Sequence, residues 1–226
     1  MPTIDLRAAD ALARPSDTTT ITRVTRFDGL DIAYDDRVLE PRPWTVLQSA
    51  WAADLAAVVP DGPILELCSG AGHIGLAAAV RCGRDLVQID ANPVACLYAA
   101  ANARAAGIAR RVDVQCAPLE HIDFGERTFP IVIADPPYLR SGDVARYSAD
   151  PRVAIDGGAD GLELVRRCTR TIAHVLHPHG AALLQLRGES QAAELSAELP
   201  PTLRIAEVRS DGPERAVALL VHRSVR

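Results

Sequence analysis

The chain has 226 residues, 48% of them hydrophobic and 23% charged, and carries a formal net charge of −5 at pH 7. This length and composition are typical of one globular domain, and no uncharged apolar run approaches the length of a membrane span. The acidic balance argues against a broad basic surface for duplex DNA or RNA, although it leaves room for a small basic patch.

The first predicted elements are a polar tail and a β-hairpin. Residues 1–20 are polar and predict a loosely docked N-terminal tail. Two β-rich segments, 21–27 and 30–34, flank the dipeptide Asp28-Gly29. This dipeptide between strands is a strong signal for a tight hairpin turn.

From residue 44 onward, predicted helices alternate with predicted strands. Helices are expected over 44–59, 73–82, 93–106, 162–176 and 189–198. Strands are expected over 63–67, 86–89, 112–116, 131–134, 181–186, 203–208 and 216–222. This alternation predicts an α/β, Rossmann-like fold, with a seven-stranded, mostly parallel sheet covered by helices on both faces. A turn at Asp211-Gly212 predicts that the last two strands pair antiparallel, completing a single domain over 21–226.

A glycine-rich loop follows the first strand of this series. Residues 66–75 read ELCSGAGHIG, so that Gly70, Gly72 and Gly75 fit GxGxxG, a pattern that brings backbone close to a ligand. A tight glycine turn without a ligand is the alternative. Asp90 ends the next strand, where its carboxylate can accept both hydroxyls of a ribose; capping of the following helix is its alternative.

Glu66 favours a methyl donor over a dinucleotide as the ligand. E-x-x-x-G-x-G is typical of S-adenosylmethionine sites, whereas an acid so near would repel the pyrophosphate of NAD. The sequence also lacks any lysine, and therefore the Tyr-x-x-x-Lys pair of many NAD-dependent oxidoreductases. The predicted cofactor-binding residues are Thr45, Glu66, Cys68, Ser69, Gly70, Ala71, Gly72, Asp90, Ala91 and Asp135.

A second motif, Asp135-Pro136-Pro137-Tyr138, directly follows the strand predicted over 131–134. A DPPY loop is typical of methyltransferases that act on planar nitrogens, whose lone pair is delocalised. The Asp135 side chain and the Pro136 carbonyl can accept the N–H bonds, while Tyr138 stacks on the planar group. We interpret these four residues as catalytic, acting mainly by positioning. A Pro-Pro turn leaving a strand is the structural alternative.

Two further segments complete an ordered set of motifs. Residues 27–45 contain FDGL and VLEPRPWT, and residues 150–162 read DPRVAIDGGADGL. Together with the two loops they resemble the HemK/PrmC family over about residues 21 to 190. The resemblance implies a class I methyltransferase fold, S-adenosylmethionine as cofactor, and the side-chain amide of a release-factor glutamine as methyl acceptor.

Three departures from that family bear on the acceptor. A short tail stands where the family has an N-terminal helical domain. DPPY replaces NPPY, and because a carboxylate only accepts hydrogen bonds, Asp135 fits a ring amine or another amine better than an amide. Trp44 and Val46 replace family acids, so that Trp44 forms either an apolar wall near the ligands or a buried helix start.

The sequence leaves several hypotheses open. The first hypothesis is N-methylation of a protein glutamine. The second is N-methylation of a nucleobase exocyclic amine in RNA or DNA, or of a small-molecule amine. A silent S-adenosylmethionine-binding partner protein is the hypothesis from another class. The oligomeric state is open.

Weaker candidates concern metals, compartment and charge. Five cysteines without CxxC spacing, and no apolar N-terminal run, indicate a cytoplasmic protein without disulfides, a metal site or a membrane anchor. Histidines 174, 177 and 179 are interpreted as residues of a helix end rather than metal ligands. His73 either contacts the cofactor or packs at a helix start. Arg140, Arg146 and Arg152 either dress the mouth of the site for an anionic substrate or form ordinary surface.

Overall fold

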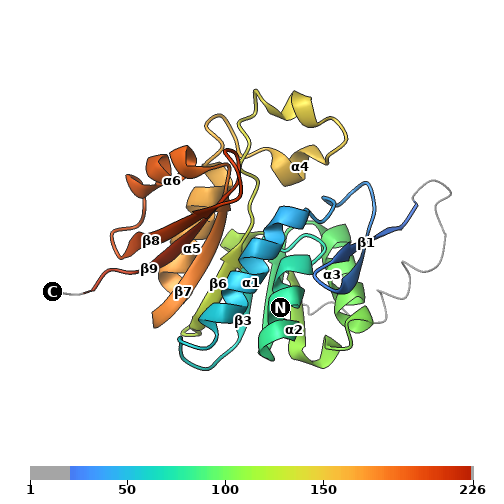
Figure 1. Cartoon of the computed structure of the whole chain (residues 1–226), viewed down its shortest axis with the longest axis horizontal. Helices are drawn as coiled ribbons and strands as arrows, with labels where there is room; N and C mark the ends of the chain where they lie inside the picture. The colour runs from blue at the N-terminus through green and yellow to red at the C-terminus, as the bar shows by residue number, and fades with distance from the viewer. Residues whose placement is uncertain (1–20, 225–226) are drawn as a thin grey trace.

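The computed structural model describes residues 21–224 (Figure 1). The tail predicted over 1–20 lies outside the described residues. Strands β1 (Arg23–Phe27) and β2 (Leu30–Tyr34) form the predicted antiparallel hairpin. Asp28 and Gly29 both have positive φ, 47° and 84°, which is what the tight turn between twisted strands requires.

The centre of the molecule is a seven-stranded sheet in the order β5-β4-β3-β6-β7-β9-β8. Its strands are β3 (Ile64–Leu67), β4 (Leu86–Asp90), β5 (Val112–Cys116), β6 (Phe129–Ala134), β7 (Leu176–Leu186), β8 (Leu203–Ser210) and β9 (Ala216–His222). Strands β3 to β7 pair parallel, whereas β9 pairs antiparallel with both β7 and β8. The predicted mostly parallel sheet with an antiparallel last strand is confirmed.

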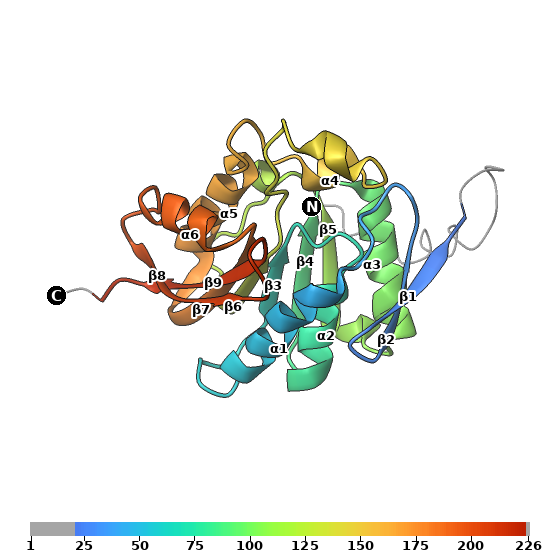
Figure 2. The ribbon, with the colours of Figure 1, turned by 45° about the horizontal axis from the view of Figure 1, so that its top comes forward.

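Helices cover both faces of this sheet (Figures 1 and 2). They are α1 (Val46–Leu55), α2 (His73–Cys82), α3 (Pro93–Ala105), α4 (Arg152–Ile155), α5 (Glu163–Val175) and α6 (Glu189–Ser196). Alternate residues of β6 point to opposite sides. Ile131 and Ile133 pack with the hairpin, α1, α2 and α3, whereas Val132 and Ala134 pack with α5 and α6. The whole of β6 is therefore buried and reads as an unbroken apolar run.

One side chain joins the hairpin to the glycine-rich loop. Asn102 of α3 is 1% exposed. Its Oδ1 accepts from the Ala33 N–H at 2.8 Å, and its Nδ2 donates to the carbonyls of Ala33 at 3.0 Å and Ala71 at 2.9 Å. The amide thus pairs with β2 as a neighbouring strand would, and it fixes the loop carbonyl at the same time.

The structure differs from the sequence-based predictions in several places. The helix expected over 44–59 is a 3-10 turn at Pro43–Thr45 followed by α1, because Pro43 starts the turn. The short helix α4 was not predicted. The histidine interpretation is wrong in part, since only His174 lies in α5 while His177 and His179 lie in β7. Within residues 21–224, no cluster of three or more metal-ligating side chains occurs and no helix could span a membrane.

Candidate active site

Two cavities open where the parallel strands β3, β4 and β6 end. The first, of about 230 Å³, is lined by the loop after β3 and the end of β4, and we call it the glycine-loop cavity. The second, of about 240 Å³, is lined by the DPPY loop, and we call it the DPPY cavity. Asp135 and Pro137 belong to the walls of both. The carboxyl ends of parallel strands are where ligands bind in such sheets.

Most of the predicted cofactor residues reach the glycine-loop cavity. The wall includes Cys68, Ser69, Gly70, Ala71, Asp90, Ala91 and Asp135. Glu66, Gly72 and Thr45 do not line it, because each is buried behind the wall and bonds or packs within the protein. The Thr45 hydroxyl, for example, donates to the Arg42 carbonyl at 2.8 Å.

Glu66 organises the glycine-rich loop from behind. Its side chain is 1% exposed, and its carboxyl accepts from the Gly75 N–H at 2.9 Å and from Gln88 Nε2 at 2.6 Å. Burial raises the pKa of Glu66 to about 7. A Cβ on Gly75 would collide with this carboxyl, and a Cβ on Gly72 would come within 2.6 Å of Gln88 Nε2. Two glycines of the motif are therefore required by the protein's own packing.

Asp90 lines the glycine-loop cavity and accepts hydrogen bonds from two backbone N–H groups. Its carboxylate accepts from the Gly70 N–H at 2.7 Å and from the Asn92 N–H at 2.8 Å. The cap of α3 is Asn92, whose side chain accepts from the Val94 N–H. Asp90 is therefore not the helix cap, and its remaining lone pairs are available to hydroxyl groups in the cavity.

The wall of the glycine-loop cavity combines apolar residues with unpaired polar atoms. Apolar residues beside Asp90 form a slot, namely Ile89, Ala117, Pro118 and Leu119. Two other lining residues carry polar atoms, Ser69 Oγ and His73 Nδ1, that are buried without a hydrogen-bond partner in the described part of the chain. Burial lowers the pKa of His73 to about 3, so the ring is neutral. A nucleoside with a polar tail matches this distribution, because unpaired buried polar atoms are costly.

Buried glutamines hold the DPPY loop at both ends. Gln48 of α1 is fully buried, and its Nε2 donates to the Ala134 carbonyl at 3.0 Å and to the Leu183 carbonyl at 2.9 Å. Gln191 of α6 donates to the Tyr138 carbonyl at 3.0 Å. Sequence reasoning missed both glutamines; the available signal was a polar residue among the apolar positions of a helix.

Asp135 differs from the other buried acids of the site. It is half-buried, and it makes no hydrogen bond or ion pair with any residue in the range 21–224. Desolvation raises its pKa to about 7. Its charge also contributes to raising the pKa of the Tyr138 hydroxyl, mainly an effect of burial. The carboxyl is thus directed at the cavities with its bonding capacity unused.

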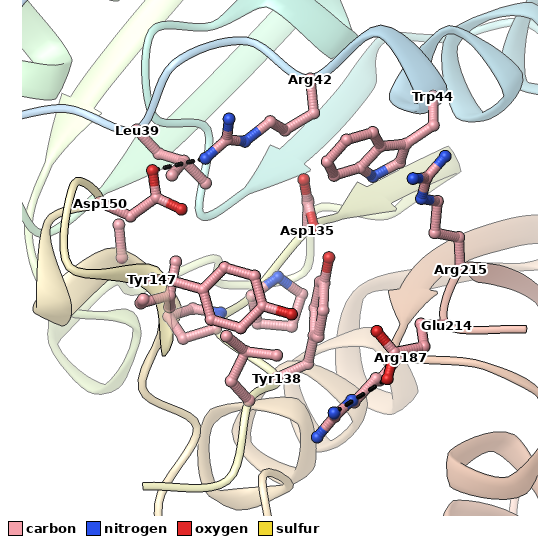
Figure 3. Close-up of a pocket in the computed structure, with 15 residues that line it drawn as sticks. Leu39, Arg42, Trp44, Asp135, Tyr138, Tyr147, Asp150, Arg187, Glu214 and Arg215 are labelled. Atoms are coloured by element: carbon pink, nitrogen blue, oxygen red, sulfur yellow. Dashed lines mark hydrogen bonds and ion pairs between the residues drawn. The ribbon is translucent and has the colours of Figure 1, made fainter. Parts of the chain in front are cut away.

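Aromatic rings and arginines form the rest of the DPPY cavity (Figure 3). Of the nine aromatic residues in the chain, Trp44, Tyr138 and Tyr147 line this cavity. The guanidinium of Arg215 lies 4.3 Å from the centroid of the Trp44 ring, and that of Arg42 lies 5.8 Å from it. Trp44 is therefore part of the cavity wall, held by two cations.

Ion pairs tie this wall to the segment around α4. Arg42 binds Asp150 at 2.5 Å, and Arg187 binds Asp143 at 2.5 Å and Glu214 at 3.0 Å. These pairs connect four stretches of chain that are distant in sequence.

For Arg140, Arg146 and Arg152 the alternative of ordinary surface holds, since none of them lines either cavity. Arg140, Arg146 and Arg152 pair instead with Glu194, Asp143 and Asp156 on the surface. The arginines that do line the DPPY cavity are Arg42, Arg187 and Arg215. Position along the chain did not reveal which arginines turn inward.

The comparisons with known proteins agree with this geometry. A family model described as "Methyltransferase domain" matches residues 64–149, which contain both loops. The release factor glutamine methyltransferase of Deinococcus radiodurans is 31% identical over 229 residues, covering 96% of this chain and 80% of that protein. This chain belongs to the release factor glutamine methyltransferase family.

Other relatives of this chain are considerably longer than it is. The ribosomal protein uL3 glutamine methyltransferase of Bradyrhizobium diazoefficiens is 31% identical over 186 residues, which cover 76% of this chain and 58% of that protein. The chain spans between 54 and 64% of three such relatives. Among solved structures, the hMettl16 catalytic domain in complex with a MAT2A 3′UTR hairpin has a TM-score of 0.69. It is 18% identical and covers 96% of this chain and 80% of that one, so it shows the fold alone.

Proposed function

We propose that this methyltransferase transfers the methyl group of S-adenosylmethionine to the side-chain amide nitrogen of a glutamine in a protein. The observation that carries the proposal is the common wall of the two cavities. A donor in the glycine-loop cavity and a planar nitrogen in the DPPY cavity would meet at Asp135 and Pro137. Family membership supports glutamine as the acceptor, since curated relatives are named for release factors and for ribosomal protein uL3.

The glycine-loop cavity would hold the donor. Asp90 would accept the ribose hydroxyls, the apolar slot beside it would hold the adenine, and the loop from Cys68 to Ala71 would contact the polar tail. When bound, S-adenosylmethionine supplies an electrophilic methyl group on a positively charged sulfur. Glu66, Gly72 and Thr45 would support this site from behind by fixing the loop.

The DPPY cavity would hold the acceptor. The Asp135 carboxyl and the Pro136 carbonyl would accept the two N–H bonds of the amide, and Tyr138 would pack on its plane. No hydrogen bond between described residues uses the Pro136 carbonyl, so it is available. Catalysis would rest on orientation, because the chain only has to align the nitrogen with the methyl group.

The test is methyl transfer with isotopically labelled S-adenosylmethionine. The purified protein is incubated with a peptide release factor, with ribosomal protein uL3, with total RNA and with small-molecule extract. Label on a glutamine of either protein, located by mass spectrometry, is the expected result. Label in the RNA or the small-molecule fraction overturns the glutamine assignment. Tight donor binding without transfer to any fraction identifies a silent binding protein instead.

One observation favours a nucleobase amine as the second candidate. Three aromatic rings line the DPPY cavity, and flat rings stack on bases in single-stranded nucleic acids. An ionised Asp135 also suits an amine, because it only accepts hydrogen bonds. The net charge of −5 weighs against this candidate. The RNA fraction of the same experiment decides between them.

We further propose that the reaction takes place in the cytoplasm. The cysteines in the described part of the chain are free thiols, which agrees with a reducing compartment. Fractionation of cells that express a tagged full-length chain tests this placement.

A further inference from the structure

Two carboxyl groups face the glycine-loop cavity, and burial raises the pKa of both, but they differ in their hydrogen bonds. Asp90 accepts two backbone N–H bonds, which stabilise a negative charge. Asp135 lines the same cavity, yet no N–H donor or cation of residues 21–224 bonds to its oxygens. A carboxylate in that position lacks compensation, and desolvation accordingly raises its pKa to about 7.

The surrounding charges do not supply the missing compensation. Toward the sheet the neighbouring groups add no positive charge, since the charges of Asp135 and Asp90 both contribute to raising the pKa of Glu66 and of Cys68. On its own loop Asp135 faces the Tyr138 hydroxyl.

Across the DPPY cavity the charged or titratable side chains are those of Arg42, Tyr147, Asp150, Arg187, Glu214 and Arg215. Arg42 and Arg187 are already engaged by acids, while Arg215 lies over Trp44 and 3.9 Å from Asp211.

The charged side chains that line the glycine-loop cavity are Asp90, Glu120, Asp135 and Arg167. Arg167 is the one cation among these four, and it is already paired with Glu120 and Glu163.

We propose that the positive charge of the methyl donor is the counter-ion of Asp135, so that donor binding releases a proton from this carboxyl and binding of the demethylated product does not. This inference rests on the proposed function. Near pH 7 a charged donor would therefore shift Asp135 from a mixture of neutral and ionised forms to the ionised form. Because the product is a neutral thioether, the charge that stabilises the carboxylate disappears during the reaction itself.

The ionised Asp135 carboxylate can also accept the proton that the acceptor nitrogen loses when it is methylated. The acceptor nitrogen forms a bond to the methyl carbon, the sulfur–carbon bond breaks, and its electron pair stays on sulfur. The nitrogen then loses one N–H proton to a carboxylate oxygen of Asp135. The carboxyl is neutral again when the thioether leaves, and the next donor releases the proton to solvent. Asp135 is thus assigned as the proton acceptor, a role beyond positioning.

Calorimetry tests the coupling without any turnover. S-adenosylmethionine and S-adenosylhomocysteine are each titrated into the full chain in two buffers of different protonation enthalpy. Near pH 7 we expect the donor to release roughly half a proton more than the product does. Below this pH the donor should bind several-fold more weakly with falling pH, since the ionised form is then scarce, while product affinity should change little.

Two variants identify the group responsible. S-adenosylmethionine and S-adenosylhomocysteine also differ in the ionisation of their own groups. The decisive quantity is therefore how much the difference in proton release between them changes when Asp135 is replaced by Asn. The Asp135→Asn variant should bind both ligands and lose the excess proton release, whereas Asp54→Asn, at an exposed position of α1, should keep it. Thermal melting checks that both variants fold.

The outcomes separate the two proposals. Excess proton release that persists in Asp135→Asn, or equal release by both ligands in the unaltered protein, overturns the inference and leaves the proposed function standing. Failure of both ligands to bind the unaltered protein overturns the proposed function and the inference with it.

Discussion

The two cavities meet at one wall but are built differently. The glycine-loop cavity comes mostly from consecutive strands of the sheet, and its acid Asp90 is held by backbone N–H groups of neighbouring loops. The DPPY cavity is assembled from distant stretches of chain joined through side chains, such as the Arg42–Asp150 pair. The first is preorganised by backbone, whereas the second depends on side chains that can rearrange. A rigid cavity suits a methyl donor that is always the same molecule, and an adaptable cavity suits a methyl acceptor that differs between relatives.

Changing Asp135 should produce the largest effect, because it belongs to both cavities. Asp135→Asn removes the proposed proton acceptor while keeping the shape of the side chain. We expect kcat for the native acceptor to fall about 100-fold, within the usual range for general-base catalysis. Single-turnover kinetics at saturating donor measure this. Unchanged or faster turnover would show that the carboxyl has no role that an amide cannot perform.

A change in packing should destabilise the glycine-rich loop. In Gly75→Ala the added methyl group collides with the buried Glu66 carboxyl, so the free energy of unfolding should fall by about 2 kcal/mol. Urea denaturation measures the loss, and donor binding should weaken in parallel. Gly142→Ala is the matched control, because its added methyl group would meet no atom within 4 Å beyond its chain neighbours. Equal stability of the two variants would contradict the packing account of the motif.

Removing a side chain from the wall of the DPPY cavity should weaken binding of the acceptor. Trp44→Ala removes one aromatic wall of the DPPY cavity, and we expect KM for the acceptor to rise roughly tenfold, as loss of a buried aromatic contact implies. The Kd of the donor should stay the same, since Trp44 does not line the glycine-loop cavity. A donor Kd that changes with the acceptor KM would mean that the two cavities are not separable.

The smallest effect is expected at the Arg42–Asp150 pair. Both side chains are partly exposed, 26% and 16%, so solvent screening limits the contribution of the pair. A double-mutant cycle with Arg42→Ala and Asp150→Ala should give a coupling of about 1 kcal/mol or less in unfolding free energy. A coupling several times larger would identify this pair as a main support of the wall around α4.

The fold was predictable because its signals are local. Helix α2 runs from His73 to Cys82 as expected, since glycines flank it on both sides, at Gly72 and Gly83. The strands follow from apolar runs, and β7 alone begins well ahead of its predicted range because its first residues interrupt the apolar pattern.

The site was predictable only where a motif marks it. The two loops were found, whereas Gln48, Gln191 and Arg215 were not, because their partners are distant in sequence. The pKa of Asp135 was also out of reach, since it depends on burial that only the folded chain creates.

The Asn102 amide makes the hairpin a reporter of events in the glycine-loop cavity. A ligand that steadies the Ala71 carbonyl also steadies the amide that pairs with Ala33. Hydrogen exchange at the Ala33 N–H should therefore slow when the glycine-loop cavity fills, although β2 forms no part of the central sheet. The hairpin is in this sense energetically linked to the ligand and not merely an appendage of the fold.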